Sequence, residues 1–156
     1  MELSYLTLGH VFISLVGICA GFGVMAGLVN GKLFPGWTAC FLITTVATSV
    51  SGFFFPFNGI TPGIVIGALS LVLLAIAIYA LYGMKLKGFW GKAFVITSIV
   101  SQYFNVLVLI VQLFQKMPAL KAIAPNQSEP PFAVTQLVVL AAFLALGFVA
   151  TKRFRA

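Results

Sequence analysis

The sequence has very few charged residues and no aspartate. Lysine and arginine together number nine, the acids number two, and charged residues make up 7% of the 156 positions, whereas hydrophobic residues make up 62%. Soluble domains are about a quarter charged, so this chain has too few charges to cover a folded surface in water. It also lacks the low hydrophobicity of disordered chains. The composition therefore excludes a water-soluble enzyme domain, a disordered tail and a nucleic-acid module, and it indicates a membrane protein.

The sequence also lacks the motifs that carry much enzyme chemistry. It has no phosphate-binding glycine loop, no dinucleotide-binding turn, no HExxH motif and no serine-nucleophile elbow. The two acids, Glu2 and Glu129, are far apart in sequence, and Cys19 and Cys40 form no CxxC pair. We therefore expect no catalysis by this chain alone, no cofactor and no metal site.

Long uncharged runs define the expected membrane spans. The longest run covers residues 33–84, and a span needs about 20 apolar residues to cross a core of about 30 Å, so this run is long enough for two helices. Prolines and glycines between residues 56 and 63 indicate the break. We predict an all-α polytopic bundle in a single domain, residues 1–156. Its five transmembrane helices are expected at about 6–29, 37–55, 62–83, 91–115 and 132–151.

Lysine and arginine are unevenly divided between the two sides of this bundle. One side would carry seven of them: Lys32, Lys85, Lys87, Lys92, Lys152, Arg153 and Arg155. The other side would carry Lys116 and Lys121. The positive-inside rule places the seven in the cytoplasm, so we expect the N-terminus outside and the C-terminus inside. The net charge of +7 is then a topology signal and a contact with anionic lipid, without nucleic acid as a partner.

The longest expected loop, residues 116–131, lies on the outer side. A short interfacial helix is expected at residues 118–124, because proline is favoured in the first turn of a helix. Pro125 would end this helix, since the residue before a proline avoids the α conformation.

Polar side chains recur at helical spacing in the expected fourth helix. At offsets of 0, 3, 4, 7 and 14 residues, on one helix face, lie Ser98, Ser101, Gln102, Asn105 and Gln112. An amide facing lipid is costly, so these groups should face protein, water or ligand. Thr45 and Thr48 belong to a companion stripe on the expected second helix. Two interpretations stay open: the stripes hydrogen-bond helix to helix, or they line a pocket or a narrow polar path.

Small residues mark positions where helices can approach closely. Gly17 and Gly21 form one small-xxx-small pattern, and Gly63 and Gly67 form another. The spacing does not decide whether these patterns join helices within one chain or between chains.

The single histidine, His10, is expected near the outer end of the first helix. It is interpreted as a hydrogen-bonded interfacial residue, an outer-side proton acceptor or a haem ligand. A haem with two histidine ligands would need a second His from a dimer or a partner subunit. Glu129 is the one acid expected to be able to approach His10.

Three stretches carry a resemblance to known proteins. They are residues 44–56 (TTVATSVSGFFFP), 114–120 (FQKMPAL) and 124–132 (APNQSEPPF). Over nearly its whole length the chain resembles a group of uncharacterised small bacterial inner-membrane proteins. The resemblance implies a multi-pass protein of the bacterial inner (plasma) membrane, and it brings no catalytic or binding residues.

We therefore expect a non-enzymatic integral membrane protein that packs in the lipid bilayer with copies of itself or with a larger complex. Gln102 and Asn105 would orient a small apolar ligand or lipid between the second and fourth helices, assisted by Gln112, Thr45 and Thr48. One alternative is a small passive channel or solute permease that uses the polar stripe of the fourth helix. Another is a haem- or quinone-associated redox subunit that uses His10.

Overall fold

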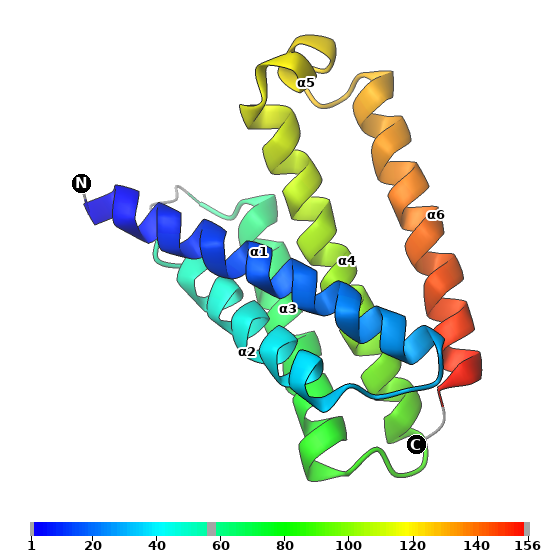
Figure 1. The fold of residues 1–156 in the computed structure, drawn as a ribbon. Coiled ribbons are helices and arrows are strands. Elements are labelled where there is room, and N and C mark those ends of the chain that lie inside the picture. Colours follow the sequence, from blue (N-terminus) through cyan, green and yellow to red (C-terminus); the bar gives the residue numbers. More distant parts are fainter. Residues whose placement is uncertain (1, 56–58, 155–156) are drawn as a thin grey trace.

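The computed structural model describes residues 2–55 and 59–154, and this part of the chain is helical between short loops (Figure 1). The elements are α1 (Glu2–Val29), α2 (Pro35–Gly52), α3 (Pro62–Ile78), the π-helical segment η1 (Tyr79–Gly83), α4 (Trp90–Lys116), α5 (Pro118–Ile123) and α6 (Pro130–Arg153). The predicted all-α class is confirmed for the described part. Part of the predicted break, residues 56–58, and the predicted cytoplasmic Arg155 lie outside the described residues.

Four of the helices begin at a proline. Pro35, Pro62, Pro118 and Pro130 each occupy the first turn of their helix, where the missing N–H costs no hydrogen bond and the fixed φ suits the helix. Two helices therefore begin two residues earlier than predicted, at 35 and 130. The short helix predicted at residues 118–124 is confirmed as α5.

Within residues 2–55 and 59–154, four helices are long and apolar enough to cross a membrane. These are Tyr5–Val29 within α1, Pro62–Gly83, Trp90–Lys116 and Pro130–Arg153. The expected second helix forms as α2, but it is not one of the four, because threonine and serine occupy six of its 18 positions. At about 1.5 Å per residue, α2 is also only about 27 Å long, against a hydrocarbon core of about 30 Å. Five spans therefore remain a prediction.

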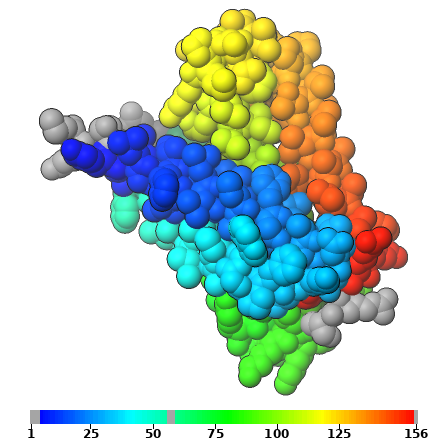
Figure 2. Space-filling view, viewed as in Figure 1, coloured from blue at the N-terminus to red at the C-terminus, as the bar shows by residue number. Residues whose placement is uncertain are grey.

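The helices form two groups that cross each other. Figure 1 shows the antiparallel pair α1 and α2 lying obliquely across α3, α4 and α6. In Figure 2 the same pair, in blue and cyan, covers the middle of the molecule, and the green segment around η1 projects beyond it. Because α1 has 28 residues and is about 42 Å long, it can cross a bilayer even at a steep tilt.

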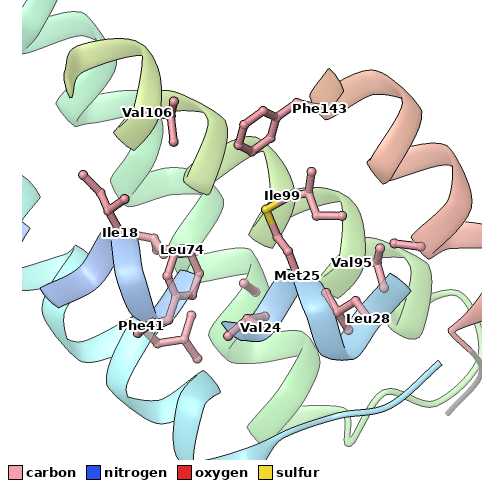
Figure 3. Packing of buried hydrophobic residues seen from close by; sticks show 14 of the residues in the cluster. Ile18, Val24, Met25, Leu28, Phe41, Leu74, Val95, Ile99, Val106 and Phe143 are labelled. Atoms are coloured by element: carbon pink, nitrogen blue, oxygen red, sulfur yellow. The ribbon is translucent and has the colours of Figure 1, made fainter. Parts of the chain in front are cut away.

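The central element is α4, which contacts α1, α3, α5, η1 and α6. It contributes eleven buried residues, whereas α6 contributes only Phe143 and Ala150. Figure 3 shows side chains from α1, α2, α3, α4 and α6 meeting in the core, among them Leu28, Phe41 and Leu74. Lipid is as apolar as these side chains, so close van der Waals packing stabilises the bundle.

Glycines allow α1 and α2 to approach each other closely. An added Cβ at Gly17 would lie 2.9 Å from Thr44 Oγ1, and one at Gly23 would lie 2.7 Å from the Trp37 ring. The pattern that begins at Gly17 therefore joins helices within this chain.

One end of the molecule gathers the basic residues. Residues 30–34, residues 84–89 and the end of α6 lie together at this end (Figure 1). A Cβ added at Gly31 would lie 3.0 Å from the carbonyl oxygen of Arg153, so the first loop touches the end of α6. We call this the basic end; α5 lies at the opposite end.

Candidate functional site

Gln102 is the centre of the polar face of α4. Its side chain is 1% exposed, and its Nε2 donates a hydrogen bond of 2.8 Å to the carbonyl of Ile18 in α1. The carboxamide occupies the space over Gly21, where an added Cβ would overlap it. The missing side chain of Gly21 therefore makes room for Gln102, and the amide fixes α1 on α4.

Asn105 extends this contact to α2. Its Nδ2 lies 3.5 Å from Thr45 Oγ1 and 3.4 Å from Gln102 Oε1, which makes both hydrogen bonds long and weak. Thr45 is buried and Asn105 is half-buried. We call Gln102, Asn105 and Thr45 the amide cluster. It joins α1, α2 and α4, so the stripes predicted on the second and fourth helices meet at these residues.

Ser98 and Ser101 lie on the buried side of α4. Both residues are buried, and within the described part of the chain neither hydroxyl has a hydrogen-bond partner. Leaving a buried hydroxyl unpaired costs about 1–3 kcal/mol. A serine in a helix can avoid this cost by donating to the carbonyl four residues earlier, but neither hydroxyl makes that bond in the described part of the chain. The two serines therefore share the face of the amide cluster without bonding to it.

Gln112 and Thr48 do not join the amide cluster. Gln112 is exposed, and Thr48 Oγ1 donates to the carbonyl of Thr44 in its own helix over 2.8 Å. Gln112 lies ten residues, about 15 Å, beyond Gln102 along α4. Because α1 and α2 cross α4 obliquely, the end of α4 nearer α5 extends beyond them (Figure 1). Gln112 therefore does not face protein within this chain as Gln102 does, and its expected role in facing water or a ligand stays a prediction.

Two further glutamines bond to α4, and the sequence analysis missed both. Gln127 Nε2 donates to the carbonyl of Val111 over 2.9 Å, and Gln136 Nε2 approaches the carbonyl of Leu107 to 3.4 Å. They fasten the loop after α5 and the start of α6 to the half of α4 nearer α5. Gln136 carried a usable signal, because it is an amide within an uncharged apolar run, as Gln102 is.

His10 is hydrogen-bonded between α1 and α2. Its Nδ1 lies 2.7 Å from Ser51 Oγ, and that hydroxyl also lies 3.1 Å from the carbonyl of Thr48. A serine hydroxyl has only one hydrogen to donate. When Ser51 donates that hydrogen to the carbonyl of Thr48, the His10 ring must carry its own proton on Nδ1 and donate it to Ser51 Oγ. Nε2 is then the unprotonated nitrogen of the neutral ring. Phe55 packs edge-on against the ring, with centroids 5.1 Å apart.

Glu129 folds back on its own loop just before α6. Its carboxylate accepts hydrogen bonds from the backbone N–H of Asn126 at 3.2 Å and of Ser128 at 3.1 Å. Partial loss of water around the Glu129 carboxyl raises its pKa. These hydrogen bonds, together with one from the backbone N–H of Glu129 itself, lower the pKa by more than that, so that it lies below its ordinary value of 4.5. Glu129 and His10 thus each have other partners, and the structure does not join them into one site.

Two apolar grooves run along the sides of α2. One, of about 350 Å³, lies between α1 and α2 and is lined partly by the free cysteines Cys19 and Cys40. The other, of about 640 Å³, lies between α2 and the end of α3, where Ile78 and Tyr82 line it; we call it the α2–α3 groove. Neither groove is lined by Gln102 or Asn105. Both of these grooves therefore lie beside α2, and neither opens onto Gln102 or Asn105 of the amide cluster.

Comparisons with known proteins leave the site to be interpreted from its geometry. No family model, curated protein or solved structure matches the chain. What the structure supports is an integral membrane protein with four apolar helices long enough to span.

Adding a methyl group at Gly21 should expel the Gln102 carboxamide from its place. We expect Gly21→Ala to destabilise the protein by about 1–3 kcal/mol, as overpacking of a core does. The measurement is the melting temperature in detergent. Gly9→Ala, with nothing within 4 Å of the added Cβ, is the matched control. In a Gln102→Ala background the cost of Gly21→Ala should shrink. Equal melting of the Gly21 and Gly9 variants would contradict the packing described.

The loop held by Glu129 should loosen only in acid. A depressed pKa means that the stabilisation is present above the unfolded-state value and is lost as the pH falls through the folded-state value. The amide ¹H–¹⁵N shifts of Asn126 and Ser128 should therefore titrate with a midpoint below 4.5. Glu129→Gln should abolish this titration. A midpoint at or above 4.5 would show that the backbone bonds do not hold the carboxylate.

Proposed function

We propose that this chain is a non-enzymatic integral protein of the bacterial inner membrane that holds an apolar molecule in the α2–α3 groove. The observation that carries the proposal is the burial of Gln102, whose amide bonds α1 to α4. An amide that lines a solute path must face open space, whereas this one fills the space over Gly21. The polar stripe is therefore better suited to holding helices together than to conducting a solute.

The α2–α3 groove has the character of a site for an apolar molecule. Aliphatic side chains of α2, among them Leu42, Val46 and Val50, line most of its length. Ile78 and Tyr82 line the side nearer the basic end. The Tyr82 hydroxyl is the only polar side-chain group among the lining residues, so the groove favours an apolar guest.

The outward face of α6 favours packing with copies of this chain or with partner subunits. Leu137 is 64% exposed and Phe148 is 63% exposed. In a bilayer such a face meets either lipid tails or another apolar helix. The proposal includes the second kind of contact, in a homo-oligomer or a larger membrane complex.

The proposal also includes five spans, with the N-terminus outside and the C-terminus in the cytoplasm. The loop that contains Lys32, the segment from Lys85 to Lys92 and the end of α6 belong to one end of the molecule. The positive-inside rule favours the cytoplasm for that end. For α2 to span with its 18 residues, the bilayer must thin slightly or residues at its ends must reach the interface.

Cysteine labelling separates five spans from four. In a background with Cys19→Ala and Cys40→Ala, a membrane-impermeant maleimide should label Ile60→Cys from outside intact cells. Lys32→Cys should react only after the cytoplasmic side is opened. These positions flank α2. Labelling of both from the same side would contradict a spanning α2, and labelling of Lys32→Cys from outside would reverse the orientation.

Flux and co-purification together test the proposed function. Liposomes with the purified protein should pass glycerol no faster than empty vesicles. Mass spectrometry should find an apolar molecule bound to the wild type and to Gln102→Leu with Asn105→Leu. It should be lost from Ala47→Phe, which fills the α2–α3 groove, and kept by Ala145→Phe, an exposed position on α6. Protein-dependent flux would favour a channel instead. If Ala47→Phe still retained the apolar molecule, binding in the α2–α3 groove would be wrong.

A further inference from the structure

The turn after η1 holds its backbone in an unusual conformation. Lys85 and Leu86 have φ values of 52° and 61°, in the left-handed region that residues other than glycine seldom adopt. Such a conformation persists where the surrounding structure determines it. Here the N–H of Leu86 donates to the carbonyl of Ala80 over 2.8 Å, and the Leu86 side chain is only 8% exposed. The buried leucine therefore anchors the turn.

Anchoring Leu86 sends its charged neighbours outward. Lys85 and Lys87, on either side of it, are both exposed, as is Lys92 two residues into α4. The sequence has no acidic residue between positions 3 and 128, and the carboxylate of Glu129 is bonded within its own loop. The chain thus presents a group of cations at its basic end. An anionic group of another molecule can neutralise these cations.

The α2–α3 groove leads to this turn. Because α2 and α3 run antiparallel, Ala39 and Tyr82 mark the groove end nearer the basic end, and Val50 marks the other. Val50 lies eleven positions after Ala39, which corresponds to about 16 Å along α2. Tyr82 is three positions before Lys85. The α2–α3 groove, which is about 16 Å long, therefore ends near the cationic turn.

Aromatic rings from both sides of the turn pack on one another near the junction of groove and turn. Tyr79 and Trp90 pack edge to face with centroids 5.2 Å apart, and Phe89 packs on Trp90 at 4.6 Å. Tyrosine and tryptophan are favoured where lipid tails meet headgroups. The rings thus indicate that the junction lies at headgroup level, with the groove extending into the hydrocarbon.

We propose that the α2–α3 groove and the basic turn together bind one anionic phospholipid of the surrounding leaflet. Its acyl chain lies along α2, and its phosphate is held by Lys85 and Lys87. This inference rests on the proposed function, whose apolar guest it identifies by chemical class. A neutral apolar molecule would use only the groove and a free phosphate only the lysines, whereas an anionic phospholipid uses both.

Native mass spectrometry of the detergent-purified protein tests the pairing of groove and charge. Dioleoyl phosphatidylglycerol and dioleoyl phosphatidylcholine are added at equal concentration. We expect at least a fivefold preference for phosphatidylglycerol, since each lysine near an anionic headgroup contributes about fivefold in affinity. Lys85→Gln with Lys87→Gln should remove most of this preference. Lys116→Gln with Lys121→Gln, at the opposite end, should leave it intact.

Filling the groove separates this inference from the proposed function. Ala47→Phe should lose both lipids, with Ala145→Phe as the size-matched control. If Ala47→Phe fails to fold, Ile43→Trp replaces it, because Ile43 is 70% exposed and lines the same groove. Loss of both lipids without any effect of the Lys85 and Lys87 changes would overturn the inference and leave the proposed function standing. Retention of both lipids by the filled, folded variant would overturn both.

Discussion

The position at which α1 crosses α4 depends on one constraint: a carboxamide inside hydrocarbon must find a hydrogen-bond partner. Gln102 meets that constraint at the carbonyl of Ile18, and it reaches this partner only because Gly21 has no side chain. The contact holds α1 on α4, and Asn105 carries it on to Thr45 in α2. In a membrane each such bond contributes only about 0.6 kcal/mol on average. Its main effect is to select one crossing position among many similar apolar contacts, since a displaced helix would leave the amide unpaired.

The same contact separates the polar and apolar parts of the protein. With the amides engaged between helices, the side chains of α2 that face away from α4 are mostly aliphatic, and the grooves form there. The hydroxyls of α2 do not interrupt this surface, because Thr44 and Thr48 bond to carbonyls of their own helix. A helix that looks polar in composition thus presents a surface suited to an apolar guest.

Much of the fold was predictable from the sequence, because charge, proline and period are local signals. Uncharged runs indicated the helices, and the offsets of Gln102 and Asn105 indicated the correct face of α4. The starts of α3 and α5 at Pro62 and Pro118 were predicted, whereas α2 and α6 begin at prolines two residues before the predicted starts. The periodicity could not say which neighbour covers that face at each level. The oblique crossing decides this, so Gln112 lies uncovered and exposed while Gln102 is 1% exposed. The contacts of Gln127 and Ser51 follow from loop and helix-end geometry, which no spacing rule contains.

Charge is excluded from the helix interiors and concentrated at one end, and this arrangement has a consequence beyond orientation. A chain without acids between positions 3 and 128 has few means of neutralising its own cations. In the turn after η1 Leu86 is buried with its backbone in the left-handed region, and the lysines on both sides of it are exposed. Tyr82, which lines one end of the α2–α3 groove, is three positions before Lys85. The molecule that satisfies both features at once needs a long apolar part and an anionic head, and the anionic lipids of the bilayer have both.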